Sequence, residues 1–390
     1  MPHKPIADAH RFPEVGVPLF WPFGLTQVGL ELTERTLKFV AEIEKTQVKR
    51  PAPQWSTPHQ VALELHTLML RDFSVNHDAP PVLVLPPYAG HSSTIADFQP
   101  GQSLVATLLH NGCARVLAAD WHSATPEMRD YDIDNYLAEI NVAVDDLGGN
   151  VALVGVCQGG WASAMYAARF PHKVRRLVLA GAPIDTDAGD GPIREAAHTL
   201  PMSFYKQLVA LGGGRLKGEF MLQGFKNMHP GKQYLDKFVE LYERIDDPTY
   251  VSRFEKFERW YEYTIDLPGR WYLQVVQELF KENRLAKGEF VGLGKRLDLK
   301  AIRCPLYLLG GRRDEITPPE QVFNAARLVG TPKSDIEQAT ADGGHIGLFM
   351  GREVLEKNWA NIARWLAGAE RVHAAGHVGT RNGAPRSVRS

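Results

Sequence analysis

Cysteine is scarce in this chain, and neither sign of charge is in excess. Its 390 residues include only Cys113, Cys157 and Cys304, which is too few for a disulfide framework and typical of a reducing compartment. Lys and Arg (44) nearly balance Asp and Glu (45), so the net charge of -1 gives no electrostatic basis for binding nucleic acid or an acidic membrane. We therefore expect a cytoplasmic protein without a nucleic-acid partner.

Signals for export, membrane insertion and metal binding are also missing. The residues after Met1 form no apolar run of the signal-peptide type. The most apolar long window, about residues 151–168, is interrupted by Gln158, Gly159 and Gly160, and its pattern is that of a strand followed by a helix. No cluster of candidate ligands has metal-binding spacing, so we expect neither a metal nor integral membrane association.

The chain does contain the alternating strand-like and helical patterns that are typical of an α/β protein. Four apolar runs with the character of buried strands are separated by helical patterns, among them one over 132–147. These strand-like runs cover residues 81–85, 114–120, 151–156 and 174–180. The alternation predicts a mostly parallel sheet with helices on both faces.

Between about residues 188 and 295 the alternation stops, and aromatic residues recur with helical periodicity. We interpret this stretch as a helical cap inserted over the carboxyl edge of the sheet. The core then resumes with a strand at 305–309, a helix over 320–329, a strand near 336 and a closing helix over 352–367.

Five segments follow from these patterns, in a chain long enough for a large core with an insertion. The first is mostly helical, with helical spacing over 25–46 and a helical or mixed stretch over 59–73. The last segment consists mainly of small, polar and basic residues, a composition that predicts disorder. The expected boundaries are 1–75 for the N-terminal segment, 76–187 for the first part of the core, 188–295 for the cap, 296–369 for the second part of the core and 370–390 for the tail.

The strongest chemical motif is Gly-Val-Cys-Gln-Gly-Gly at residues 155–160, between an apolar strand and an apolar helix. Glycines two positions on either side of Cys157 let strand and helix meet at a strained corner, as in the nucleophile elbow of the α/β-hydrolase fold. Cysteine replaces the usual serine, and a thiolate is a better nucleophile and leaving group for thioester chemistry. The motif predicts an α/β-hydrolase fold in which Cys157 takes an acyl group from a thioester.

A cysteine nucleophile needs a general base and a carboxylate that orients the base, and in this fold the chain order is nucleophile, acid, histidine. Asp314 follows the strand at 305–309, and His345 follows the last strand and two glycines. We predict a triad of Cys157, His345 and Asp314. Glu315, next to Asp314, and Asp342, close to His345 in sequence, remain alternatives for the acid.

The oxyanion would be stabilised by backbone N–H groups on either side of the nucleophile. One belongs to Gln158, the residue after the cysteine, and another to the loop at Tyr88 and Ala89 that follows the first core strand.

Three further side chains are candidate substrate contacts. His91 lies at a strand end on the side expected for the active site, where a structural or rim histidine is the alternative. Trp121 ends a strand and Trp161 lies in the elbow helix, and packing is the common role of a buried tryptophan. Cys113 and Cys304 are expected to be inert core residues.

These motifs resemble those of polyhydroxyalkanoate synthases, most closely the short catalytic subunits of the two-subunit type. The cysteine motif at 155–160 and Asp-Gly-Gly-His-Ile-Gly at 342–347 are the specific parts of a resemblance that spans roughly residues 57–366. Other strings that fit the synthase pattern lie at 95–105, 247–260, 280–285 and 298–306.

The resemblance implies that Cys157 is acylated, with His345 as the base and Asp314 as the acid. The thiolate would take a 3-hydroxyacyl group from coenzyme A and pass it to the hydroxyl of a polyester chain, so coenzyme A enters as part of the substrate and no cofactor is expected. The implied partners are hydroxyacyl-CoA and a polyester chain or granule, at whose surface the cytoplasmic protein could work. An activating subunit and a homodimer both remain open.

The loop at 88–94 departs from the synthase pattern, because it lacks the usual asparagine and resembles the Gly-His loop of intracellular polyhydroxyalkanoate depolymerases. Those enzymes also use a cysteine nucleophile and differ in passing the acyl group to water. Strings at 181–185, 271–280 and 344–352 resemble depolymerases too. We expect a synthase-like acyltransferase, with a depolymerase or cysteine-dependent esterase as the alternative. A third hypothesis is a non-catalytic granule-binding protein that uses the apolar residues 19–23.

Overall fold

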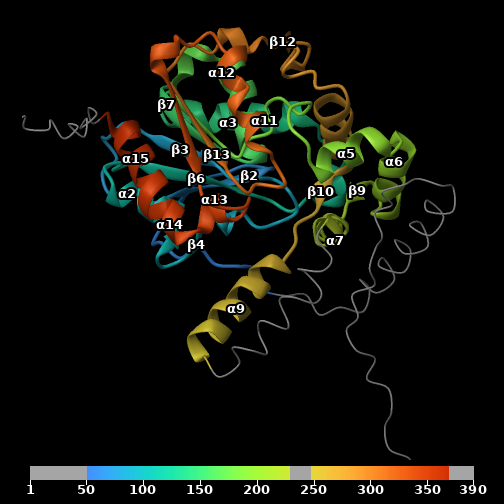
Figure 1. Ribbon diagram of the computed structural model, residues 1–390, viewed down its shortest axis with the longest axis horizontal. Coiled ribbons are helices and arrows are strands. Elements are labelled where there is room, and N and C mark those ends of the chain that lie inside the picture. The colour runs from blue at the N-terminus through green and yellow to red at the C-terminus, as the bar shows by residue number, and fades with distance from the viewer. Residues whose placement is uncertain (1–50, 229–246, 369–390) are drawn as a thin grey trace, which may run out of the picture.

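An eight-stranded sheet runs through the protein in the computed structural model, which describes residues 51–228 and 247–368 (Figure 1). The strand order is β1-β2-β6-β3-β7-β8-β13-β14. The strands span Gln60–Glu64 (β1), Leu68–Asp72 (β2), Val82–Leu85 (β3), Val116–Trp121 (β6), Val151–Val156 (β7), Val174–Ala180 (β8), Leu306–Gly311 (β13) and Ile336–Ala341 (β14). The six strands from β6 to β14 are mutually parallel, and β1 and β2 pair antiparallel at one edge. This is the sheet of the α/β-hydrolase fold, so the predicted fold class is confirmed.

Alternate residues of the central strands face two separate hydrophobic cores. In β3, Leu83 and Leu85 pack on one side, and Val82 and Val84 on the other. Side chains alternate across a strand, so a fully apolar run such as β3 is buried only if both faces of the sheet are covered by helices. The helices that cover them are α3 (Ile133–Asp146) and α4 (Gln158–Arg169) on the first side, and α2 (Leu104–His110) and α15 (Ala360–Ala367) on the second.

The remaining elements of the core are short. They are the 3-10 turns η1 (Ser93–Ala96), η2 (Pro126–Asp130), η3 (Pro171–Lys173), η6 (Leu299–Ala301) and η7 (Lys333–Asp335), the strands β4 (Asp97–Gln99) and β5 (Gln102–Ser103), the helices α11 (Pro319–Phe323), α12 (Ala325–Leu328), α13 (Gly347–Met350) and α14 (Arg352–Val354), and the π-helical turn η8 (Leu355–Trp359). The helix expected over 320–329 is therefore interrupted at Asn324. The closing helix over 352–367 is present with a π-helical turn inside it.

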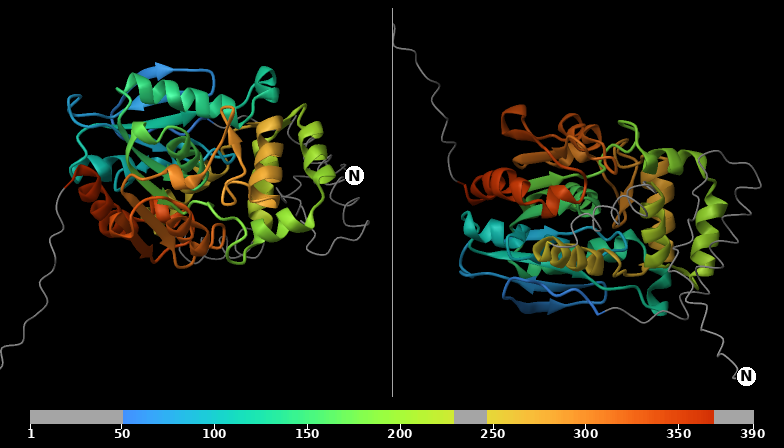
Figure 2. Two further views of the ribbon diagram at one scale, coloured as in Figure 1. Left: turned by 90° about the horizontal axis from the view of Figure 1, so that it is seen from above. Right: turned by 60° about the horizontal axis from the view of Figure 1, so that its bottom comes forward.

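The segment expected as a cap contains helices, a two-stranded sheet of β9 and β10, and the small hairpin β11–β12. Its described elements are α5 (Pro192–Thr199), α6 (Met202–Leu211), β9 (Arg215–Leu216), α7 (Gly218–Met228), α9 (Pro248–Tyr261), β10 (Leu267–Pro268), α10 (Gly269–Gln274), the π-helical η5 (Val275–Lys281), β11 (Val291–Gly292) and β12 (Lys295–Arg296). Most of these helices gather at one end of the core, away from the closing helix α15 (Figure 2). The cap joins the loop after β3, since the N–H of Ile265 donates to the carbonyl of Gly90 over 2.9 Å.

The prediction of a helical or mixed stretch over 59–73 is wrong where it implied helix, because this stretch forms the hairpin β1–β2. Leu68 and Leu70 are buried, whereas Met69 and Arg71, which alternate with them along the chain, are half-buried. This alternation is the two-residue period of a strand. Pairing of β2 with β6 outweighs the weak helical spacing. The helix expected over 25–46, the apolar residues 19–23 and the tail at 370–390 lie outside the described residues.

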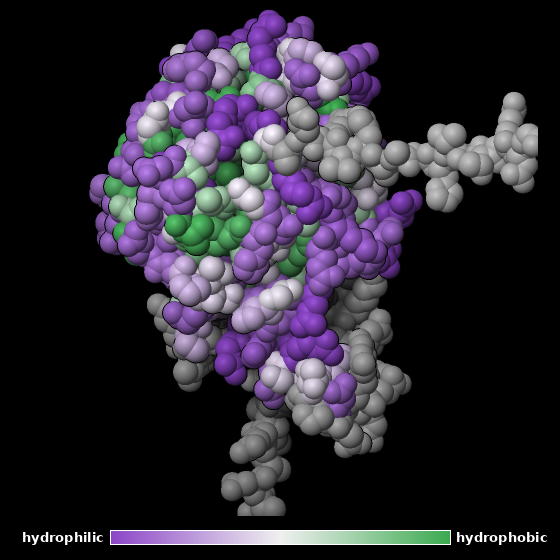
Figure 3. Space-filling model, turned by 90° about the vertical axis from the view of Figure 1, so that its left-hand side faces the viewer, coloured by the Kyte–Doolittle hydropathy of each residue, from purple (hydrophilic) through white to green (hydrophobic). Residues whose placement is uncertain are grey.

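No helix within residues 51–228 and 247–368 is both long and apolar enough to cross a membrane. Within the same ranges, no group of three or more His, Cys, Asp or Glu side chains is placed to hold a metal ion. The face of the molecule on the side of α15 is mostly hydrophilic, with smaller groups of hydrophobic residues between the polar ones (Figure 3).

The hairpin β1–β2 leads to a prediction about the stability of the fold. Leu70 is fully buried in β2, so Leu70→Ala should lower the free energy of unfolding by about 2–5 kcal/mol. Val61 in the partner strand is 47% exposed, and Val61→Ala should change it by no more than about 0.5 kcal/mol. Urea unfolding followed by circular dichroism measures both free energies. Equal effects of the two substitutions would contradict the burial of Leu70 and the exposure of Val61.

Candidate active site

Cys157 lies between the end of β7 and the start of α4, in a backbone conformation that side chains rarely adopt. Its φ of 51° and ψ of -119° lie outside the regions usual for L-residues, and such strain persists only where neighbouring structure imposes it. The Cys157 N–H donates to the carbonyl of Ala180 over 2.9 Å, and its own carbonyl accepts from Gly160 N–H over 2.8 Å. These bonds hold the thiol at the carboxyl edge of the sheet.

This corner requires glycine at two positions, because neighbouring segments of the protein approach the backbone there too closely for a side chain. A Cβ on Gly159 would lie 1.9 Å from the carbonyl oxygen of Leu85, and a Cβ on Gly160 would lie 2.2 Å from the Cβ of Ala182. The first turn of α4 therefore rests directly on the backbone at the end of β3. Any side chain at Gly159 would push the helix away from the sheet and displace Cys157.

Asp314 and His345 come from the two loops that follow β13 and β14. The Nδ1 of His345 lies 2.8 Å from Oδ2 and 3.0 Å from Oδ1 of Asp314, whose side chain is fully buried. Oδ1 also accepts the N–H groups of Ile316 (3.0 Å) and Thr317 (2.9 Å), which fix the carboxylate. A carboxylate only accepts, so Nδ1 carries the proton and the other ring nitrogen is left for Cys157.

The histidine interacts with both predicted partners. Burial by itself would lower the pKa of His345, but the charges of Cys157 and Asp314, together with hydrogen bonds to both side chains, raise it well above its ordinary value. In general, a positively charged imidazole beside a sulfur activates a cysteine nucleophile. The structure thus brings together the three side chains that the sequence singled out, in the arrangement of a nucleophile, a base and an orienting acid.

The two alternative carboxylates lie elsewhere. Asp342 is exposed and pairs with Arg312 over 2.8 Å. Glu315 is exposed as well. Among the candidates for the acid, only Asp314 has a hydrogen bond with His345.

The candidate oxyanion donors lie on the two segments that meet at the elbow. Gln158 is the first residue of α4, so its N–H has no acceptor within the helix. Tyr88 and Ala89 belong to the loop after β3, which the Tyr88 hydroxyl anchors by donating to the carbonyls of His122 (3.1 Å) and Asp266 (3.2 Å). Their role as oxyanion donors stays a prediction.

His91 is buried under the cap and is not a residue of an open rim. It follows Gly90 (φ 85°), is 9% exposed and stacks on three aromatic rings of α7 and α9. The ring centroids lie 5.0 Å from Tyr261, 5.3 Å from Trp260 and 5.9 Å from Phe225. Burial lowers the pKa of His91 to about 4, so the ring is neutral at neutral pH. The predicted contact of His91 with substrate stays a prediction.

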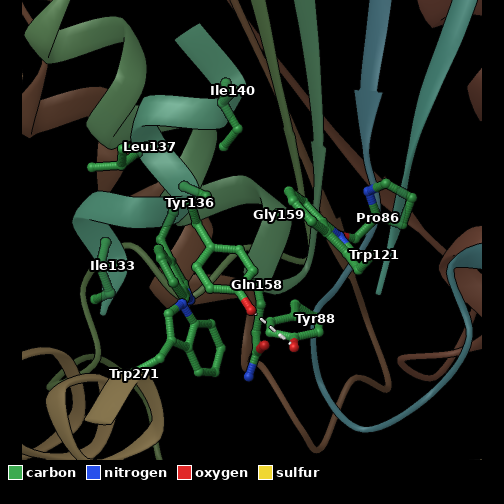
Figure 4. Close-up of a pocket in the computed structure, with 12 residues that line it drawn as sticks. Pro86, Tyr88, Trp121, Ile133, Tyr136, Leu137, Ile140, Gln158, Gly159 and Trp271 are labelled. Carbon is green, nitrogen blue, oxygen red and sulfur yellow. Dashed lines mark hydrogen bonds between the residues drawn. The ribbon is translucent and has the colours of Figure 1, made fainter. Parts of the chain in front are cut away.

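Trp121 and Trp161 line a small cavity whose walls include neither Cys157 nor His345 (Figure 4). Trp121 Nε1–H donates to the carbonyl of Pro86 over 2.8 Å, and Trp161 packs on Trp271 with ring centroids 5.9 Å apart. Their predicted contact with substrate remains a prediction. Nothing in the sequence pattern indicated this cavity, because it is built by residues from α3, α4, α10, the end of β6 and the loop after β3.

Comparisons with known proteins show which proteins the chain is similar to. A family model described as "Protein of unknown function (DUF3141)" matches residues 48–375. The chain is 30% identical to the poly(3-hydroxyalkanoate) polymerase subunit PhaC of Haloferax mediterranei over 351 residues, which cover 86% of this chain and 68% of the relative. It is 28% identical to the subunit of the same name from Allochromatium vinosum over 320 residues, 80% of this chain and 88% of the relative.

Among solved structures, the chain is similar to an enol-lactonase from Burkholderia xenovorans LB400, with a TM-score of 0.49 and 14% identity over 79% of this chain and 99% of that one.

The close approach at the elbow leads to a first prediction for this site. Gly159→Ala should lower the free energy of unfolding by about 1–3 kcal/mol or more, because the new methyl group meets backbone atoms that cannot yield. Gly347→Ala is a matched control, since no atom lies within 4 Å of its added Cβ. Thermal unfolding of both variants measures the difference, and an unaffected Gly159→Ala protein would contradict the contact.

The buried pair leads to a second prediction. Asp314→Asn removes a negative charge that favours protonation of the ring, so the pKa of His345 should fall. In nuclear magnetic resonance titrations of protein with labelled histidine, His345 in the wild type should remain protonated to higher pH than in this variant, with His345→Gln used to assign its signal. Asp342→Asn, at the exposed pair with Arg312, should leave the titration unchanged.

Proposed function

The chain belongs to the DUF3141 family and to the family of the poly(3-hydroxyalkanoate) polymerases, and from this membership and its site we propose that it is a 3-hydroxyacyl transferase that builds a polyester from coenzyme A thioesters. The observation that carries the proposal is the hydrogen-bonded series Cys157–His345–Asp314 at the elbow. A buried cysteine paired with a protonated histidine suits attack on a thioester.

In the first half-reaction, the Cys157 thiolate attacks the carbonyl carbon of a 3-hydroxyacyl-CoA. A bond forms between Sγ and the acyl carbon, and the bond from that carbon to the sulfur of coenzyme A breaks. His345 gives its proton to the departing thiolate, while Asp314 holds the ring through Nδ1. The N–H of Gln158 and an N–H of the Tyr88–Ala89 loop would hold the oxyanion, each donor contributing about 2.7–4 kcal/mol to the stability of the transition state.

In the second half-reaction, the now neutral His345 takes the proton of a hydroxyl group that attacks the acyl-cysteine. An ester bond forms, the carbon–sulfur bond breaks and the thiolate returns beside a protonated His345. The acceptor is the hydroxyl of a further hydroxyacyl group or of the chain end. We propose that this happens at a polyester granule, and that His91, on the loop that carries the second oxyanion donor, faces the acyl chain.

Burial of the site supports transfer to a hydroxyl over hydrolysis. Cys157 is 7% exposed, and the side chain of His345 is 11% exposed. A site that excludes water protects an acyl-enzyme from hydrolysis until a bound acceptor arrives.

The other two cysteines provide controls. Burial raises the pKa of both Cys113 and Cys304 to about 11, so each is a protonated thiol at neutral pH. Neither should be acylated by a thioester.

The test uses purified protein with 3-hydroxybutyryl-CoA, alone and with a candidate activating subunit, and measures both released coenzyme A and ester-linked product. Wild type should release coenzyme A and form polymer. Cys157→Ala should abolish both, Asp314→Asn should lower kcat by about 10²–10⁴-fold, and Cys304→Ala should keep the activity.

Other outcomes would contradict the proposal in different ways. Coenzyme A released with an equal amount of free 3-hydroxybutyrate and no polymer would identify a thioesterase. No release of coenzyme A, but release of hydroxybutyrate from amorphous polymer granules, would identify a depolymerase. Full activity of Cys157→Ala in cells would support a non-catalytic role.

A further inference from the structure

Beside both candidate oxyanion segments lies a small cavity whose wall of mostly buried aromatic and aliphatic residues also contains polar atoms. It is bordered by Gln158 and Gly159 of the elbow, by Pro86 and Tyr88 of the loop after β3, and by aromatic and aliphatic residues of α3, α4 and α10 (Figure 4). Its volume, measured for the centre of a water molecule, is about 20 Å³. One water molecule needs roughly 10–15 Å³ by this measure, so the cavity has room for one.

Two polar atoms in this wall lack a partner among the described residues. They are the side-chain oxygen Oε1 of Gln158 and the indole Nε1–H of Trp161, both buried. Trp161 is only 3% exposed, so bulk water does not reach its N–H group. A buried donor or acceptor left unpaired costs about 1–3 kcal/mol, and such groups in native proteins are usually satisfied by an ordered water.

The two atoms have complementary hydrogen-bonding roles, and their side chains border the same cavity. Gln158 and Trp161 are three residues apart in α4, which puts them on the same face of the helix. Trp161 offers a donor and Gln158 an acceptor, so a single water molecule that accepts from the first and donates to the second satisfies both.

A third partner is available from α3. The hydroxyl of Tyr136 donates its one proton to the hydroxyl of Tyr88 over 2.9 Å and keeps a lone pair free to accept. Both hydroxyls border the cavity, and the Gln158 side chain extends toward them (Figure 4). Three hydrogen bonds are the usual number for a buried water.

We propose that this cavity binds one structural water molecule that joins the two halves of the oxyanion hole. It accepts from Trp161 Nε1–H and donates to Gln158 Oε1 and Tyr136 Oη. Through it Trp161 and Tyr136 act as positioning residues, since one end of the bridge holds Gln158, which carries an oxyanion N–H, and the other holds Tyr88, which anchors the opposite loop. The kinetic part of the inference rests on the proposed acyl-transfer function, whereas the binding of water does not.

The direct test is a crystal structure of the wild-type protein at a resolution that shows ordered water. A water within about 2.7–3.2 Å of Trp161 Nε1 and Gln158 Oε1 is the expected result. A cavity without water, or a Gln158 side chain bonded directly to the indole, would overturn the inference.

The kinetic test uses substitutions that remove the proposed hydrogen-bonding group and leave a large apolar side chain in its place. Trp161→Phe and Gln158→Met, the second of which keeps the backbone N–H, should each lower kcat about 5–10-fold with KM within twofold, the size expected for one hydrogen bond. The double variant should be no slower than the slower single variant, because both act through the same water. Multiplicative losses in the double variant would overturn the positioning role.

Tyr166→Phe is the matched control. It also removes a single hydrogen bond from a buried aromatic side chain of α4, the one from the Tyr166 hydroxyl to Asn141 over 3.0 Å. It should lose stability and keep kcat, and an equal loss of kcat would show that any weakening of this helix has the same effect.

The two proposals fail in different ways. If the wild type transfers no acyl group but its crystal structure contains the water, the proposed function is wrong and the site stands. If the wild type is active and the cavity holds no water, the inference is wrong and the function stands. A double-mutant cycle on thermal stability with Trp161→Phe and Gln158→Met tests the bridge without any activity, and additive losses would count against it.

Discussion

The contact on which the rest of the site depends is that between the first turn of α4 and the end of β3. Gly159 lies so close to the carbonyl of Leu85 that no side chain fits between them. This contact fixes the corner at which Cys157 takes its strained conformation, and it brings Gln158 beside the loop that carries Tyr88 and Ala89. A nucleophile and two candidate oxyanion donors are therefore positioned by one backbone contact, not by flexible side chains.

The parallel sheet does the remaining assembly. Strands β7, β13 and β14 end at the same edge, so the loops after them bring Cys157, Asp314 and His345 together although 188 residues separate the first from the last. Although these groups are buried, the charges of Cys157 and Asp314 outweigh the effect of burial and raise the pKa of His345 well above its ordinary value. His91 shows the opposite balance a short distance along the chain, because its aromatic stack under the cap offers little to offset burial and its pKa falls to about 4. The surroundings alone thus shift the pKa values of two histidines on the active-site side in opposite directions.

Membership in the polymerase family and the geometry of the site support the same kind of chemistry, acyl transfer through a cysteine. The three residues of a triad do not determine which group accepts the acyl group from the cysteine. In this chain the arrangement around the candidate triad bears on that question, because Cys157 is buried and an aromatic cavity lies beside the candidate oxyanion segments. The cavity depends on the packing of α3, α4 and α10, and not on the three residues of the candidate triad.

The sequence by itself determined the fold class, the elbow and the three residues of the candidate triad, because each depends on local signals: apolar runs of strand length, glycines at fixed spacing, and polar residues directly after strands. It did not determine that Asp314, and not Asp342, meets His345, that residues 60–72 form a hairpin, or that His91 lies inside an aromatic stack. Nor did it reveal the cavity that Gln158, Trp161 and Tyr136 share. Those facts depend on contacts between residues far apart in the chain, which form only when the helices and the cap pack on the sheet, so only the tertiary structure could decide them.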